Sequence, residues 1–298
     1  MKVLVTGAAG FIGSHIVPRL VSEGMDVTCI DTPEGYAAGR LKGIERKVHL
    51  ITADITQPSL FDAVSEPLDT VLHLAALASP ILCDQNPPLA FLLNVNGTHN
   101  VLKLALKCRA EKVVFASTAH VYGISPRYMP TDERHPLWLQ DTYTTTKILG
   151  EQLCQLFYEN HGLSYLTLRL YNGYGPGQPT GYFIPDIIRK AQAGQINLKG
   201  GEVTKDFVFV SDVASAFVKA VSSEYVGNLN IGSGRETRLK DVASTIAQAF
   251  GVQLTPVLSE GSNPTRMLCD WTRALKILEW RPKVSLEEGL RRTIETWR

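Results

Sequence analysis

Thr6-Gly-Ala-Ala-Gly-Phe-Ile-Gly13 follows the short apolar run Val3-Leu-Val5 near the start of the chain. The apolar run predicts a strand, and residues 11–23 predict a helix. Glycines in such a turn let the backbone approach a pyrophosphate, while the helix supplies free N–H groups and a positive dipole. The stretch therefore predicts a dinucleotide site, with a glycine-rich turn that holds no ligand as the alternative. The residues expected to form the site are Gly7, Gly10, Phe11, Ile12 and Gly13.

An acidic side chain follows the second predicted strand. Asp31 stands directly after residues 27–30, about 20 residues beyond the glycines. A carboxylate at this position can bind both hydroxyls of a ribose and repels a 2′-phosphate. The sequence therefore favours NAD over NADP, and Arg40 is the nearby cation that argues for the opposite choice.

Strands alternate with helices through the first half of the chain. Further strands are predicted at residues 48–51, 70–74, 112–116 and 164–168, and longer helices at 89–107 and 143–160. This alternation predicts an α/β fold, a Rossmann-type doubly wound parallel sheet with helices on both faces. A Gly/Pro-rich stretch at residues 171–179 marks a boundary. We expect an NAD-binding domain at 1–170, with about 207–233 packing back onto it, and a smaller α/β substrate lobe at 171–298.

Composition argues against nucleic-acid-binding, membrane-spanning and disulfide-rich classes of protein. The 298 residues carry a net charge of +1, with 44% hydrophobic and 20% charged residues, which is typical of an ordinary soluble globular protein. We therefore expect no nucleic-acid partner, and no apolar run reaches the ~20 residues of a membrane span. The five dispersed cysteines favour a reducing cytoplasm over disulfides, and neither they nor the seven histidines have metal-ligand spacing.

Two further strand ends carry candidate cofactor contacts. Asp54 and Ile55 follow the third strand, where they are expected to contact adenine or to form a strand-end turn. His73-Leu-Ala-Ala76 ends the fourth strand, and its small side chains would let a cofactor lie against the backbone of Leu74, Ala75 and Ala76. His73 itself is expected to be a packed side chain and not a catalyst.

Tyr143 and Lys147 lie four residues apart in a predicted helix, so their side chains share one face. A phenol has a pKa near ~10, and a neighbouring positive charge lowers that pKa. Such a pair can accept and donate a proton near neutral pH. An ordinary exposed helix face gives the same spacing, so the pair gains meaning only from its surroundings.

The motifs together resemble those of the extended short-chain dehydrogenases/reductases, and specifically the NAD-dependent nucleotide-sugar epimerase/dehydratase family. The resemblance covers essentially the whole chain. Besides the stretches above, it rests on Asn94-Val-Asn-Gly-Thr98, Ala116-Ser-Thr-Ala-His-Val-Tyr-Gly123, Arg169-Leu-Tyr-Asn-Gly-Tyr-Gly-Pro176, Lys205-Asp-Phe-Val-Phe-Val-Ser-Asp212, Asn230-Ile-Gly-Ser-Gly234 and Leu278-Glu-Trp-Arg-Pro282.

This resemblance implies roles for individual residues. Thr118 matches the catalytic hydroxyl, with Tyr143 as the proton acceptor and Lys147 as its cationic neighbour. Lys205 stands where many relatives carry Arg. A lysine cannot make the bidentate contact with a phosphate that an arginine makes. Arg266 resembles an arginine that grips the nucleotide diphosphate. The full set of expected substrate contacts is Ser79, Thr118, His120, Tyr143, Asn172, Lys205 and Arg266, within pocket walls at 77–84, 177–183 and 199–201.

Two residues after Thr118 bear on the outcome of the reaction. Family dehydratases commonly have Asp-Glu where this chain has Ala119 and His120, and family decarboxylases usually have Glu at the second position. Ala78-Ser-Pro80 and Asn86-Pro-Pro88 nevertheless resemble the decarboxylase sequence. We expect an NAD-dependent 4-epimerase of a UDP-hexose or UDP-uronic acid that acts through a transient 4-keto sugar. UDP-glucuronate decarboxylation, 4-ketoreduction, dehydration and a catalytically silent NAD-binding regulator are the alternatives.

The resemblance also implies a homodimer. The helices predicted at 89–107 and 143–160 match those that pair across the dimer in relatives, where they form a four-helix interface. Apolar positions on these helices could equally be covered within one subunit.

Overall fold

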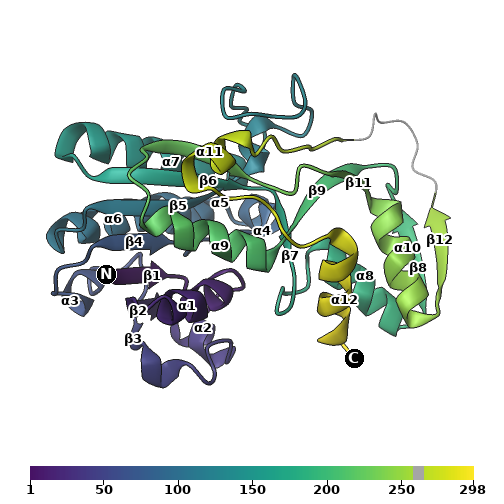
Figure 1. Ribbon diagram of the computed structural model, residues 1–298, viewed down its shortest axis with the longest axis horizontal. Coiled ribbons are helices and arrows are strands. Elements are labelled where there is room, and N and C mark those ends of the chain that lie inside the picture. Colours follow the sequence, from purple (N-terminus) through teal and green to yellow (C-terminus); the bar gives the residue numbers. More distant parts are fainter. Residues whose placement is uncertain (258–264) are drawn as a thin grey trace.

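The computed structural model describes residues 1–257 and 265–298. Its main element is a seven-stranded sheet in the order β10-β6-β5-β4-β1-β2-β3, in which all neighbouring strands are parallel (Figure 1). The predicted α/β fold with a doubly wound parallel sheet is confirmed. The strands are β1 Lys2–Thr6, β2 Asp26–Asp31, β3 His49–Thr52, β4 Thr70–His73, β5 Lys112–Thr118, β6 Ser164–Leu170 and β10 Gly227–Ile231.

Helices cover both faces of this sheet because the strand side chains are apolar on both faces. Val3 and Val5 of β1 pack with α1 and α9, whereas Leu4 packs on the opposite side with α6 and α7. The helices of this part are α1 Gly13–Ser22, α2 Pro33–Ala37, α3 Leu60–Ala63, α4 Pro80–Gln85, α5 Pro87–Phe91, α6 Gly97–Lys107, α7 Thr142–His161, α9 Val210–Val221 and α11 Thr272–Leu278, with 3₁₀ turns at Glu45–Lys47 and Ala119–Tyr122.

A smaller lobe lies beyond the end of the large sheet at which β6 leads into β7 (Figure 1). It contains a three-stranded sheet, β11-β9-β7, and a two-stranded sheet, β12-β8, with a separate hydrophobic core. Its elements are β7 Asn172–Tyr174, α8 Phe183–Gln192, β8 Gln195–Lys199, β9 Thr204–Phe209, β11 Glu236–Arg238, α10 Leu239–Phe250, β12 Gln253–Val257 and α12 Leu286–Glu295. Ser285 caps α12 by accepting a hydrogen bond from the Glu288 N–H at 3.2 Å.

The helix predicted at residues 89–107 differs in its middle. It begins at Pro87, and Leu92–Asn96 form a π-helical segment between α5 and α6. Asn94 in this segment is buried, and its side chain bonds both backbone groups of Leu77 and the hydroxyl of Thr146. The wider turn thus aims an amide at tertiary partners, which no helical periodicity in the sequence reveals.

Three absences hold for the described residues. Their helices include none that is long and apolar enough to cross a membrane. No group of three or more His, Cys, Asp or Glu side chains among them could hold a metal ion. All five cysteines are free and buried.

The turn between β1 and α1 is packed backbone against backbone. Gly7 has a φ of +69°, and a Cβ on Gly13 would lie 2.3 Å from the Gly7 carbonyl oxygen and 2.6 Å from that of Ala8. Neither oxygen can move without displacing β1 or α1. Glycine at position 13 is therefore required for the helix to pack this close to the strand.

We expect Gly13→Ala to lower the free energy of unfolding by about 1–3 kcal/mol, because the added methyl overpacks the turn. Chemical denaturation monitored by circular dichroism measures this change. Gly173→Ala is the matched control, since its Cβ would meet no atom closer than 3.9 Å. A Gly13→Ala protein as stable as the wild type would contradict this description of the turn.

Candidate active site

A cavity of about 320 Å³ lies between the large sheet and the smaller lobe. Phe11 and Ile12 line it from the glycine turn, Thr118 from the end of β5, and Phe207 from β9. The other lining residues are Ala78, Ser79, Pro80, Ile81, Ser117, His120, Tyr143, Leu170, Tyr171, Asn172, Gly173, Tyr174, Gln178, Gly181, Tyr182, Phe183, Ile184 and Lys205. None of these described lining residues is Asp or Glu.

Thr118 and Tyr143 meet in this cavity, as the sequence predicts. Thr118 is the last residue of β5, and its hydroxyl caps the following 3₁₀ turn by accepting from the His120 N–H at 3.2 Å. Tyr143, from the first turn of α7, lines the same cavity as Thr118. The strand-end cap and the catalytic position predicted for Thr118 are thus compatible.

Lys147 lies one turn after Tyr143, and its Nζ donates to the Ala116 carbonyl at 3.0 Å. The ammonium also lies 5.0 Å from the centre of the Phe115 ring. Burial lowers the pKa of Lys147 to about 8, so the group is mostly charged at neutral pH. These contacts fix the Lys147 side chain beside Phe115 and Ala116, close to the end of β5 at which Thr118 lies.

The direction of the pKa shift at Tyr143 differs from the one expected from Lys147 alone. Burial, and next the proximity of Tyr182, raise the pKa of the Tyr143 phenol, although the Thr118 side chain opposes this. At neutral pH the phenol therefore keeps its proton in this environment. Because a cation brought beside it would favour the phenolate, its basicity depends on what binds next to it.

The glycine turn and Asp31 form a site that fits a dinucleotide. A Cβ on Gly7 would lie 2.7 Å from the Ala75 backbone nitrogen, so only glycine leaves room between the turn and the end of β4. Asp31 accepts from the Ala9 N–H at 2.8 Å and from the Thr32 N–H at 2.9 Å, which fixes its carboxylate at the turn. Arg40 lies nearby and donates to the Ala9 carbonyl at 3.3 Å.

The two other predicted cofactor segments take part in the local packing. Asp54 accepts from the Thr56 N–H and hydroxyl, both at 2.8 Å, which is the strand-end turn predicted as its alternative role. The Ile55 side chain is buried against Gly97. His73 is buried between the hydroxyls of Thr6 and Thr98, and burial lowers its pKa to about 3, so it is a packed neutral histidine.

His120 and Lys205 are the basic groups of the cavity. The His120 ring lies edge-on to Tyr143, with 6.3 Å between ring centres. Burial, and next the charge of Lys205, lower the pKa of His120 to about 4, so the imidazole is neutral at neutral pH. Burial also lowers the pKa of Lys205, which bonds no carboxylate among the described residues. Lys205 is therefore the cation that the cavity offers to an anionic ligand.

The remaining predicted contacts divide into two groups. Ser79 and Asn172 line the cavity, and the Asn172 side-chain amide donates to the Asp206 carbonyl at 2.9 Å. Arg266 does not line it, because its guanidinium forms two 2.6 Å bonds with Glu236 at the surface. The predicted walls at 199–201 and 82–84 are also absent from the lining. A substrate contact by these residues stays a prediction, and Arg266 would have to leave Glu236 to reach a ligand in the cavity.

Tyr182 falls within the predicted wall at 177–183 and lines the cavity. Its hydroxyl donates to the Ala78 carbonyl at 3.3 Å, which connects the smaller lobe to the segment before α4. Other lining residues were not predicted, among them Phe207 and Tyr174, which supply an apolar wall from the smaller lobe. Alternation along β9 places Lys205 and Phe207 on the same face, which was a usable signal.

The chain is similar to known proteins over essentially its whole length. The model of the NAD dependent epimerase/dehydratase family matches residues 3–232. The UDP-glucose 4-epimerase of Mycolicibacterium smegmatis is 34% identical over 100% of this chain and 99% of its own, and UDP-glucuronic acid decarboxylase 5 of Arabidopsis thaliana is 30% identical over 97% and 87%. The crystal structure of a Thermotoga maritima UDP-glucose 4-epimerase with UDP-glucose superimposes with a TM-score of 0.91 at 29% identity, covering 100% of this chain and 99% of that one.

We expect Asp31→Ser to raise the dissociation constant for NAD by roughly ten- to a hundred-fold, the effect of losing charged hydrogen bonds to a ribose. The binding of NADP should strengthen relative to that of NAD, because the carboxylate that repels a 2′-phosphate is removed while the Arg40 cation remains near the turn. Isothermal titration with both dinucleotides measures the ratio. Asp26→Ser, at the exposed start of β2, is the control. Unchanged affinity for NAD in the Asp31→Ser protein would refute this assignment.

Proposed function

The chain belongs to the NAD dependent epimerase/dehydratase family, and we propose that it is an NAD-dependent nucleotide-sugar 4-epimerase. Its substrate is a UDP-linked hexose or hexuronate, which is oxidised at C4 and reduced again on the opposite face. The relatives named above include both a 4-epimerase and a decarboxylase, so the family alone leaves the outcome open. The choice between them depends on the side chains of the cavity.

One observation carries the proposal. Thr118 and Tyr143 share a cavity in which none of the described lining residues is acidic. Eliminating water from a 4-keto sugar needs a further acid and base, whereas epimerisation needs only oxidation, rotation of the sugar and reduction. His120, which stands where an acidic residue would serve elimination, is half-buried and neutral.

The residues of this chain would then act as follows. Tyr143 accepts the proton of the C4 hydroxyl, and Thr118 orients that hydroxyl. Lys147 holds a positive charge at the end of β5, which favours the phenolate form of the tyrosine. NAD, when bound, supplies the hydride acceptor and donor. Lys205 would balance the negative charge of the nucleotide diphosphate.

Nucleotide-sugar conversion distinguishes the alternatives directly. The protein with NAD is incubated with UDP-glucose, UDP-N-acetylglucosamine or UDP-glucuronate, and the products are identified by NMR. We expect a C4 epimer without accumulation of NADH. Return of every sugar unchanged by a protein that binds NAD would defeat the proposal.

UDP-glucuronate decarboxylation is the second candidate, because Lys205 lines the cavity without a carboxylate partner in the described part of the chain, where it would hold the carboxylate of a uronic acid, and because decarboxylases are among the relatives. Carbon dioxide release together with a UDP-pentose product would establish it. Epimerisation of the same substrate without carbon dioxide would exclude it.

We expect Tyr143→Phe to lower kcat by roughly 10²–10⁴-fold, the usual contribution of a general acid–base group. Affinity for NAD should stay near that of the wild type, because the ring is retained. Tyr128→Phe, at a tyrosine that is 43% exposed, is the matched control and should leave kcat unchanged. Near-normal turnover by the Tyr143→Phe protein would exclude the proposed role.

We also propose a homodimer in which the π-helical segment and α7 meet their copies. These helices pack side by side and leave a row of large apolar side chains exposed to between 37% and 49%, namely Leu89, Phe91, Leu92, Leu149, Leu156 and Tyr158. Leu156→Glu should convert the dimer to a monomer in light scattering, whereas Leu275→Glu on α11 should not. A monomeric wild-type protein would refute the dimer.

A further inference from the structure

A buried ion pair lies directly behind the catalytic residues. Glu151 stands on α7 one turn after Lys147, and Arg169 lies on β6. Each side chain is 3% exposed. Arg169 donates from Nε to Glu151 Oε1 at 3.0 Å and from Nη2 to Oε2 at 2.6 Å, so both carboxylate oxygens are held.

The same carboxylate holds the catalytic strand. Ser117, the residue before Thr118, donates its hydroxyl proton to Glu151 Oε1 at 2.5 Å. One side chain therefore joins three elements: β5, which ends in Thr118; α7, which carries Tyr143 and Lys147; and β6. Movement of this carboxylate would change the relative positions of the groups that act on the sugar.

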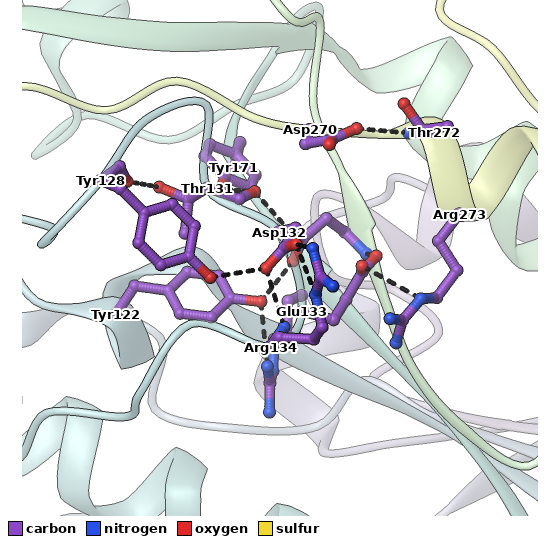
Figure 2. Close-up of polar contacts among 12 residues, drawn as sticks. Tyr122, Tyr128, Thr131, Asp132, Glu133, Arg134, Tyr171, Asp270, Thr272 and Arg273 are labelled. Atoms are coloured by element: carbon purple, nitrogen blue, oxygen red, sulfur yellow. Dashed lines mark hydrogen bonds and ion pairs between the residues drawn. The ribbon is translucent and has the colours of Figure 1, made fainter.

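The network continues from Arg169 into the loop between β5 and α7. Arg169 Nη1 donates to the Tyr122 hydroxyl at 2.9 Å, which in turn donates to Asn230 Oδ1 at 2.6 Å. The Asn230 amide donates to the Thr131 carbonyl at 2.9 Å. Figure 2 shows Tyr122 beneath the loop that carries Thr131 and Glu133, with Arg273 of α11 reaching Glu133. The loop that leads into Tyr143 is thus fastened to the same network.

We propose that Glu151 and Arg169 are positioning residues, which hold Thr118 and the catalytic face of α7 in register for the reaction proposed above. Stability alone is a weak reason for such a pair, because well-packed apolar side chains of similar volume are often as stabilising as a buried ion pair. Its placement against Ser117 and one turn from Lys147 fits a role in the reaction.

The charges around Lys147 determine the direction in which the loss of Glu151 would shift its pKa. Burial lowers the pKa of Lys147, and the nearby Glu151 carboxylate raises it. Loss of that negative charge should therefore lower the pKa of Lys147 further. The other titratable groups that couple to Lys147 are Cys83, Cys154 and the neutral His73, while Arg169 partly offsets the charge of Glu151.

Three variants separate charge from position. Glu151→Gln keeps the shape and the acceptor oxygen but removes the charge, so the alkaline limb of the kcat–pH profile should move to lower pH by about one unit. The pH dependence of the NAD dissociation constant should shift in the same direction. Glu151→Asp keeps the negative charge, so the alkaline limb of its profile should lie at the wild-type pH. Ser117→Ala leaves the Glu151 charge intact, so the alkaline limb should stay at the wild-type pH. It should lower kcat roughly ten-fold with little change in KM, because Thr118 is less well positioned.

Glu202→Gln, at an exposed pair with Lys240, is the matched control and should leave both profiles unchanged. If Glu151→Gln does not fold, Ser117→Ala and Glu151→Asp carry the test. The proposal is overturned if a folded Glu151→Gln protein keeps the wild-type pH profile, or if Ser117→Ala turns over at the wild-type rate.

Discussion

The parallel direction of the sheet strands is the constraint on which the site depends. β1, β4, β5 and β6 all end at the same edge, so the segments that follow them in the sequence meet in space. Gly7, Ala75 and Thr118 come together in this way although they are far apart along the chain. Ligands of open α/β sheets bind at this edge for the same reason, and the smaller lobe closes the cavity from the other side.

Burial then sets the chemistry of the groups at this edge. It lowers the pKa of Lys147 to about 8 and that of His120 to about 4, and it raises the pKa of Tyr143. The cavity therefore contains a protonated phenol, a neutral imidazole and the Lys205 amine, with no carboxylate among its described lining residues, and the Lys147 ammonium lies next to it at the end of β5. Such a set favours reversible oxidation of a sugar alcohol over elimination. Glu151 contributes its negative charge from behind the cavity, where it is held by Arg169.

The sequence predicted the parts of the structure that depend on local pattern. Strand–helix alternation predicted the sheet, and the glycine spacing predicted the tight turn between β1 and α1. Features that depend on tertiary partners were not predictable. The π-helical turn is made by the buried amide of Asn94, and the pairing of Arg266 with Glu236 joins residues that no short-range pattern relates. The partners of Glu151 lie on three different elements and likewise leave no local signal.

The central claim is that one cavity removes and returns hydrogen at C4 of a nucleotide sugar. Incubation with UDP-glucose, UDP-N-acetylglucosamine and UDP-glucuronate, each deuterated at C4, followed by NMR of the products, tests it most directly. The account predicts that the sugar which is converted gives its C4 epimer and keeps the deuterium at C4, because the hydride leaves and returns without exchange with water. Replacement of the deuterium at C4 by protium in the epimer would contradict it. A UDP-sugar that is changed at another carbon, while C4 keeps its configuration, would contradict it as well.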